Sequence, residues 1–295
     1  MRRVIAAVAD SAFEIVTALA PDTVDVRRLP DGRDDAVFLL PDWGDRETLR
    51  ALPGLERLRV VQTLSAGTDW IEASVPVWTT LCNARGTRDA AVAEWVVGAL
   101  LGDAYGQFAA ARSRRWSDAL PRELLGATVL IVGYGSIGRD VERLLEPFGV
   151  TVIGVARRAR KGVHAVTELP ALVGQADAVV VLAPIMPETT GLVDAELLAR
   201  MRDGALLVNA GRGRVVDTGA LVAELESGRL RAVLDVVDPE PLPDDHPLWD
   251  LALAITPHNA GDTEAADERA VRLGAEQLVR FARGERLLNV VREAR

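Results

Sequence analysis

Cysteine and basic charge are the two things that this sequence has little of. Cys82 is the only cysteine, which excludes a disulfide framework and a cysteine-based zinc site, and we predict no metal. Lys and Arg number 34 against 43 Asp and Glu, so the formal net charge is −9. This balance argues against nucleic acid as the main partner, because phosphate binding needs a basic face. No apolar run reaches the roughly 18 residues of a membrane-spanning helix, so we expect no membrane contact.

The sequence does have enough apolar material for a folded core. Hydrophobic residues make up 49% and charged residues 26% of the 295 positions, which is typical of a globular chain. At roughly 100–200 residues per domain, this length predicts two domains. The first apolar stretch, Val4 to Ala9, is shorter than the core of a signal peptide and predicts a β-strand instead. A soluble, cytoplasmic protein is therefore expected.

Short β-branched runs alternate with helical segments along the chain, and this alternation predicts an α/β fold with parallel sheets. The expected strands in the first part are residues 3–9, 23–26, 35–40, 58–64 and 77–82, with helices at 11–20 and 45–51. A long helix is expected over 87–111, capped by Thr87 or Asp89. The second part has expected strands at 128–132, 150–155, 178–183, 205–210, 232–236 and 253–257, a helix at 136–148 and a last helix at 265–282.

The segment GYGSIG, Gly133 to Gly138, matches the dinucleotide fingerprint G-x-G-x-x-G. An apolar strand precedes it and a helical segment follows it, as a Rossmann-type domain requires. The first glycine permits the tight turn, the second lets the backbone approach a pyrophosphate, and the third lets helix and strand pack closely. The N-terminus of the helix supplies N–H groups and positive potential to the phosphates. The alternative is a glycine-rich turn that binds nothing.

In a Rossmann-type domain, the residue at the end of the second strand contacts the 2′ position of the cofactor ribose. An NAD site has Asp or Glu there, but this sequence has Ala156 and no acid between Glu146 and Glu168. Four cations follow it, namely Arg157, Arg158, Arg160 and Lys161. Because a guanidinium group binds a phosphate well, the segment predicts a preference for NADPH over NADH. The alternative is a solvated run of charges.

Three polar segments follow predicted strands in the second part of the chain. They are 209–213, which contains an Arg, 235–241, which is acidic, and 256–258, which ends in a His. Ligands bind outside the carboxyl ends of strands in open α/β sheets, so we expect these groups to converge near the cofactor. An Arg grips a carboxylate with two parallel hydrogen bonds, and a His passes protons at neutral pH. The set suits proton-coupled hydride transfer to a 2-oxo acid.

These segments together resemble the D-isomer-specific 2-hydroxyacid dehydrogenase family. The matching stretches are GYGSIG, LAPIMPETTGLVD, LLVNAGRGRVVDTGAL, LDVVDPEPLPDDHPLW and ITPHNAG, and the resemblance runs from about Leu64 to the end. It implies a catalytic Arg212 that binds the substrate and polarises its carbonyl, a catalytic Glu240, and His258 as the acid–base group. Asp238 is the alternative partner of His258. His164 and His246 are interpreted as structural.

The resemblance also assigns binding residues. The backbone N–H groups of Ala66 and Gly67, in an S-x-G-x-D loop, would hold the substrate carboxylate. Arg212 and His258 are the other residues expected to bind the substrate. Asp235 would bind the nicotinamide carboxamide. The residues expected to contact the cofactor are Tyr134, Gly135, Ser136, Ile137, Arg157, Arg158, Ala183, Pro184, Ala210, Asp235 and His258.

The family pattern further implies a discontinuous first domain and a homodimer. Residues 1–93 and 266–295 would form a flavodoxin-like substrate domain, and residues 94–265 a Rossmann-type dinucleotide-binding domain. Homodimers of the family form through the cofactor domain, and the long helix from Thr87 suits that role. The sequence departs from the family at Val237, Asp238 and Trp95. Trp43 is either a wall of the substrate pocket or a half-exposed loop residue.

The predicted activity is NAD(P)-dependent hydride transfer, with NADPH preferred, to a small 2-oxo acid such as glyoxylate or hydroxypyruvate, giving a D-2-hydroxy acid. His258 would donate the proton to the carbonyl oxygen. Two alternatives stay open. One is a non-catalytic nucleotide-sensing binding protein, and the other is a dehydrogenase of the same family that acts on phosphoglycerate or phosphite. The sequence does not identify the physiological acid.

Overall fold

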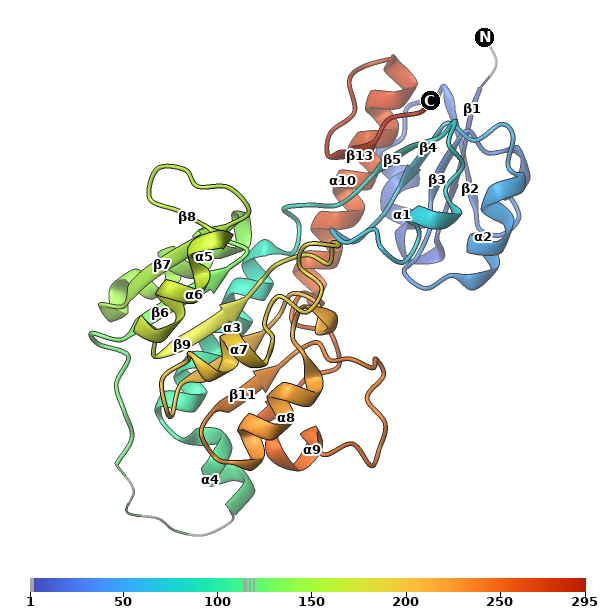
Figure 1. Ribbon diagram of the computed structural model, residues 1–295. Helices are drawn as coiled ribbons and strands as arrows, with labels where there is room; N and C mark the ends of the chain where they lie inside the picture. The colour runs from blue at the N-terminus through green and yellow to red at the C-terminus, as the bar shows by residue number, and fades with distance from the viewer. Residues whose placement is uncertain (1–2, 114–115, 117, 119) are drawn as a thin grey trace. The chain divides into compact units, whose positions relative to one another are not determined.

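The chain folds into two compact α/β units. The computed structural model describes residues 3–113, 116, 118 and 120–295 (Figure 1). Unit 1 comprises Met1–Arg88 and Asp262–Arg295, and unit 2 comprises Asp89–Gly261. These junctions lie a few residues before the positions 93/94 and 265/266 that the sequence analysis uses. One helix begins at Asp89 and the last helix begins at Glu264, so the observed junctions divide neither helix between the two units.

Unit 1 is a six-stranded sheet with helices on its faces. Its elements are β1 (Val4–Val8), α1 (Asp10–Leu19), β2 (Val24–Arg28), β3 (Phe38–Leu40), α2 (Arg46–Ala51), β4 (Val60–Gln62), β5 (Thr80–Cys82), α10 (Glu264–Arg283) and β13 (Val290–Arg292). The strand order is β13-β5-β4-β3-β1-β2. Strands β1 to β5 are parallel in the flavodoxin-like order, and β13 adds an antiparallel edge.

Both faces of the unit 1 sheet are buried, which explains its apolar strands. Successive side chains of a strand point to opposite faces. In β3, Phe38 and Leu40 therefore join one core cluster, while Leu39 joins the other. The first cluster also receives Val271, Ala275 and Leu278 of α10, which packs beside α1. The C-terminal helix α10 therefore belongs to unit 1 (Figure 1).

Unit 2 is a seven-stranded parallel sheet. Its elements are α3 (Asp89–Ala104), α4 (Gln107–Ser113), β6 (Thr128–Val132), α5 (Ser136–Leu145), β7 (Thr151–Ala156), β8 (His164–Ala165), α6 (Leu169–Leu172), β9 (Ala178–Val181), α7 (Ala195–Ala199), β10 (Leu206–Asn209), α8 (Thr218–Glu226), β11 (Arg231–Leu234), α9 (Leu248–Leu251) and β12 (Ala254–Ile255). The order β12-β11-β10-β9-β6-β7-β8 is that of a Rossmann fold, with β6 as its first strand. The predicted fold class is confirmed.

The order of this sheet reverses between β6 and β9, and that position matters for function. Chain connections leave β6 toward β7 on one side and return to β9 on the other. In open α/β sheets, ligands bind at such a switch point, outside the carboxyl ends of the strands. The glycine-rich segment follows β6 directly, so the fold places it at this position.

The expected long helix over 87–111 is wrong as a single helix. It divides into α3 and α4, and Gly106 between them has a φ of +63°, which a helix cannot contain. Thr87 is not at the N-cap position, because α3 begins at Asp89 and Arg88 directly precedes it; the Thr87 hydroxyl donates to the carbonyl of Ala84. The helix expected over 136–148 ends as α5 at Leu145, just before Pro147.

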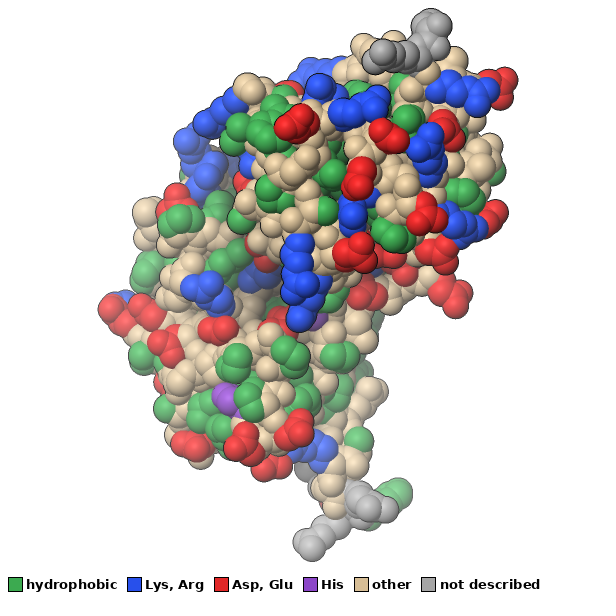
Figure 2. Space-filling view, turned by 90° about the vertical axis from the view of Figure 1, so that its right-hand side faces the viewer, with side chains coloured by type: hydrophobic (Ala, Val, Ile, Leu, Met, Phe, Trp, Pro, Cys, Tyr) green, Lys and Arg blue, Asp and Glu red, His purple; other side chains and the backbone are tan. Residues whose placement is uncertain are grey.

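The exposed surface mixes both signs of charge. Acidic and basic side chains are interspersed over the face drawn in Figure 2. Exposed ion pairs such as Arg272–Glu268 and Arg200–Glu196 account for part of this arrangement. Among the described residues, no helix is both long enough and apolar enough to cross a membrane.

Candidate active site

The glycine-rich loop after β6 makes a tight turn against the end of β9. Gly133 has a φ of +92°, and a Cβ atom there would lie 2.5 Å from the backbone nitrogen of Ala183. Only glycine fits this close approach. Helix α5 begins directly afterwards, at Ser136. Within the described part of the chain, no protein acceptor bonds to the N–H groups of Gly135, Ser136 and Ile137.

These N–H groups fit the pyrophosphate of a dinucleotide. A helix N-terminus presents unsatisfied donors and positive potential, both of which favour an anion. The loop lies at the switch point between β6 and β9, where a nucleotide binds in this class of sheet. Ala183 and Pro184 follow β9, and Ala210 follows β10. These three predicted cofactor residues therefore lie at the carboxyl ends of the strands, as the glycine-rich loop does.

The segment after β7 carries the cations that bear on cofactor choice. Ala156 is the last residue of β7, and no acid stands there. Arg157, Arg158, Arg160 and Lys161 are all exposed. Arg160 differs from the other three, because its Nη2 donates to the backbone oxygen of Tyr134 in the glycine-rich loop at 2.5 Å.

The turn after β10 holds Arg212 in an extended conformation, with φ −143° and ψ 141°. Asn209 shapes this turn, because its Oδ1 accepts from the N–H of Gly211 at 3.1 Å and its Nδ2 donates to the oxygen of Arg212 at 3.2 Å. A Cβ atom on Gly213 would lie 1.9 Å from the carbonyl oxygen of Val237. The glycine therefore allows the Arg212 turn to contact the loop that leads to Glu240.

His258 and Glu240 form a direct pair. The distance from His258 Nδ1 to Glu240 Oε1 is 2.7 Å, and the two side chains are 34% and 37% exposed. A carboxylate only accepts hydrogen bonds, so Nδ1 carries the hydrogen, and Nε2 is the ring nitrogen that Glu240 does not engage. The predicted alternative partner, Asp238, does not make this bond. His258 also has a φ of +54°, a strained conformation of the kind found at functional sites.

Asp235 holds the loop that carries His258. It is 4% exposed, and its Oδ1 accepts from Thr256 Oγ1 at 2.5 Å and from the N–H groups of Asn259 at 3.0 Å and Ala260 at 3.1 Å. The N–H of His258 donates to the backbone oxygen of Asp235 at 2.8 Å. From the sequence, Asp235 was predicted only to bind the nicotinamide, so this role was missed. No local pattern signals it, because Asp235 is 21 or more residues away from the groups that it binds.

The predicted carboxylate-binding loop lies in unit 1. Asn83 Nδ2 donates to the oxygen of Ala66 at 2.6 Å, and Ser65 Oγ donates to the oxygen of Gly67 at 2.7 Å. In the described chain, no protein acceptor bonds to the N–H groups of Ala66 and Gly67. Asn83 fixes this loop, although the sequence analysis did not single it out. Trp43 is 67% exposed within the same unit.

Comparison with known proteins gives a consistent family. Residues 99–260 match the family model described as D-isomer specific 2-hydroxyacid dehydrogenase, NAD binding domain. The chain is 33% identical over 272 residues to D-3-phosphoglycerate dehydrogenase of Methanocaldococcus jannaschii, which covers 87% of this chain and 52% of that protein. It is 33% identical over 274 residues to glyoxylate reductase of Thermofilum pendens, which covers 86% of this chain and 79% of that protein.

A solved structure is similar over almost the whole chain. It is the NADPH-dependent glyoxylate/hydroxypyruvate reductase of Sinorhizobium meliloti in complex with NADP and sulfate. The TM-score is 0.83, the sequences are 28% identical, and the match covers 98% of each chain. By contrast, the present chain spans about half the length of the phosphoglycerate dehydrogenase that it matches.

Proposed function

Because the chain belongs to the D-isomer specific 2-hydroxyacid dehydrogenase family of oxidoreductases, we propose that it reduces a small 2-oxo acid to the D-2-hydroxy acid, reversibly. The observation that carries this proposal is the hydrogen bond between His258 Nδ1 and Glu240 Oε1 at 2.7 Å. A non-catalytic nucleotide sensor has no need for such a pair beside a dinucleotide loop. The nicotinamide, when bound, supplies the hydride to C2 of the substrate.

The chain's own residues handle the proton and the substrate. His258 donates a proton from Nε2 to the carbonyl oxygen as that oxygen becomes a hydroxyl, and it takes the proton back in the reverse direction. Glu240 keeps the ring oriented through Nδ1. Arg212 binds the substrate carboxylate with its guanidinium group and polarises the carbonyl. In unit 1, the N–H groups of Ala66 and Gly67 are proposed as carboxylate-binding donors.

We propose glyoxylate or hydroxypyruvate as the substrate class, since two of the relatives carry those names. The loop after β3 offers Asp42 and Asp45 before Arg46, which disfavours the phosphate of phosphoglycerate. The test is oxidation of NADPH and NADH with a panel from glyoxylate through pyruvate and hydroxypyruvate to phenylpyruvate. Turnover highest with glyoxylate or hydroxypyruvate supports the proposal. No turnover with any member, with nucleotide binding intact, favours the sensor.

We also propose that NADPH is preferred. The basis is Ala156 at the end of β7, followed by the exposed Arg157 and Arg158. An acid at this position would repel the 2′-phosphate, and the cations add charge-assisted hydrogen bonds. Replacing Arg157 and Arg158 together by Ala should raise the KM for NADPH and change that for NADH much less. A higher kcat/KM of the wild type with NADH would overturn the preference.

The family expectation of a homodimer through unit 2 has support in helix α3. Of its sixteen residues only Asp89, Glu94 and Asp103 are charged, so the helix is apolar almost all round. Such helices are normally buried on all sides. Within this unit, however, Gly98 is exposed, and a Cβ atom added there would meet nothing within 4 Å. We propose that a second copy of the chain packs on this face.

A further inference from the structure

Arg160 is turned back toward the glycine-rich loop. Its Nη2 donates to the backbone oxygen of Tyr134 at 2.5 Å, and its guanidinium carbon lies 5.8 Å from the centre of the Tyr134 ring. Its backbone is also fixed, because its N–H donates to the oxygen of Val163 at 3.0 Å and its oxygen accepts from the N–H of Val163 at 2.8 Å. Arg160 is therefore exposed, but both its backbone and its guanidinium group are held by hydrogen bonds.

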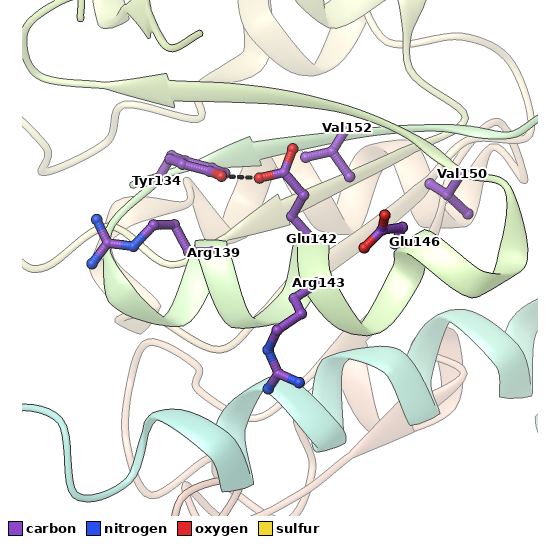
Figure 3. Close-up of a pocket in the computed structure, with 7 residues that line it drawn as sticks. All are labelled: Tyr134, Arg139, Glu142, Arg143, Glu146, Val150 and Val152. Atoms are coloured by element: carbon purple, nitrogen blue, oxygen red, sulfur yellow. Dashed lines mark hydrogen bonds between the residues drawn. The ribbon is translucent and has the colours of Figure 1, made fainter. Parts of the chain in front are cut away.

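Tyr134, the residue that Arg160 contacts, is itself fixed at its backbone, its hydroxyl and its ring. Its N–H donates to the oxygen of Val155 at 2.9 Å, and its hydroxyl donates to Glu142 of helix α5. Figure 3 shows these two side chains pointing toward one another along a pocket beside α5. A Cβ atom on Gly154 would lie 2.7 Å from the Tyr134 ring, so this glycine makes room for it.

The protonation state of Tyr134 agrees with this arrangement. Burial and the neighbouring Glu142 raise the pKa of Tyr134 to about 12. The hydroxyl therefore stays protonated at neutral pH and remains a donor to the carboxylate. The bond anchors the ring, and with it the backbone of the second position of the fingerprint.

The peptide group between Tyr134 and Gly135 links the anchored Tyr134 carbonyl to the orientation of the Gly135 N–H. A trans peptide is planar, so its carbonyl oxygen and its N–H point to opposite sides. Arg160 fixes the carbonyl of Tyr134, and this aims the N–H of Gly135 away from Arg160. The N–H of Gly135 is one of the three donors at the start of α5 that no described protein group accepts.

We propose that Arg160 is a positioning residue that aligns the pyrophosphate-binding N–H of Gly135, and that it serves NADH and NADPH alike. This inference rests on the proposed nicotinamide cofactor. It separates three of the four cations after β7 into two kinds. Arg160 orients the glycine-rich loop through Tyr134, whereas Arg157 and Arg158 discriminate the 2′-phosphate.

The test compares the dissociation constants of both nucleotides in matched variants. Arg160→Met should weaken NADH and NADPH by the same factor, about tenfold, because the N–H of Gly135 is then no longer preorganised for the pyrophosphate. The kcat at saturating cofactor should stay unchanged, because the reacting groups are untouched. Arg160→Lys retains a donor and should recover part of the loss. Arg143→Met, which removes an exposed cation from α5, is the control and should change neither constant.

Three results would overturn the inference. If Arg160→Met weakens NADPH alone, Arg160 is a ligand of the 2′-phosphate. If it weakens neither nucleotide, the contact with Tyr134 has no role in binding. If kcat falls with the affinity, the loss is not confined to cofactor alignment. A wild type that prefers NADH would refute only the proposed NADPH preference. The role of Arg160 would then be tested by the dissociation constant for NADH. A wild type that binds neither nucleotide refutes both.

Discussion

At the scale of single residues, the candidate chemistry depends on a few side chains placed just after strands. In the proposed mechanism, Glu240 acts through the ring of His258, whose Nδ1 lies 2.7 Å from Glu240 Oε1. Glu240→Gln keeps the shape of the side chain but removes its charge, so kcat for hydroxypyruvate reduction should fall by roughly tenfold to a hundredfold. The KM for NADPH should change little. Asp238→Asn is the control, and an equal loss in that variant would contradict the assignment of Glu240 as the partner.

Arg212 allows a second prediction at this scale. Arg212→Lys keeps the charge but loses the planar pair of donors that matches a carboxylate. Because Arg212 is assigned both binding and polarisation, we expect KM for the 2-oxo acid to rise and kcat to fall together. Steady-state kinetics with glyoxylate measure both. Near-normal values would mean that another cation binds the carboxylate, and Arg85 and Arg88 precede α3 as the nearest candidates in the sequence.

At the scale of elements, the unit 1 sheet is joined to the C-terminal segment through Gln277 of α10. This amide is fully buried. It donates to Gln62 Oε1 at 2.9 Å and to the oxygen of Leu288 at 2.7 Å, and it accepts from the N–H of Leu288 at 2.8 Å. Gln277→Leu would leave these partners without a hydrogen bond, each at a cost of about 1–3 kcal/mol. We expect the free energy of unfolding to fall by about 3 kcal/mol or more, measured by urea denaturation.

The control is Gln175→Leu, at an exposed position, which should change the free energy of unfolding by under about 0.5 kcal/mol, as surface changes usually do. Equal effects would contradict the role of this network.

The elements also show what the sequence can predict. Long apolar runs such as Thr128–Val132 were located to the residue, because burial on both faces leaves a continuous signal. The strands β8 and β13 were missed, since they are two and three residues long and lie at sheet edges. The break between α3 and α4 was missed because only Gly106 marks it. At the site, the roles of Asp235 and Asn83 depend on tertiary contacts with Ala260 and Ala66, which no local pattern encodes.

At the scale of the whole molecule, the apolar face of α3 predicts association. Gly98→Glu adds a charge where a single chain has open space, so the variant should fold but dissociate. Sedimentation velocity should give a dimer for the wild type and a monomer for Gly98→Glu. Ala223→Glu, on the exposed side of α8, should remain dimeric. A monomeric wild type, or a Gly98→Glu variant that stays dimeric, would remove this face from the interface.

The central claim is that this chain reduces 2-oxo acids through His258, and one comparison tests it most directly. The kcat for hydroxypyruvate reduction is measured in the wild type and in His258→Ala, together with the dissociation constant for NADPH. A positioned general acid contributes ~10²–10⁴-fold, so we predict a loss of that size in kcat with NADPH binding nearly unchanged. A loss below about tenfold, where a positioned acid would cost far more, would contradict the account.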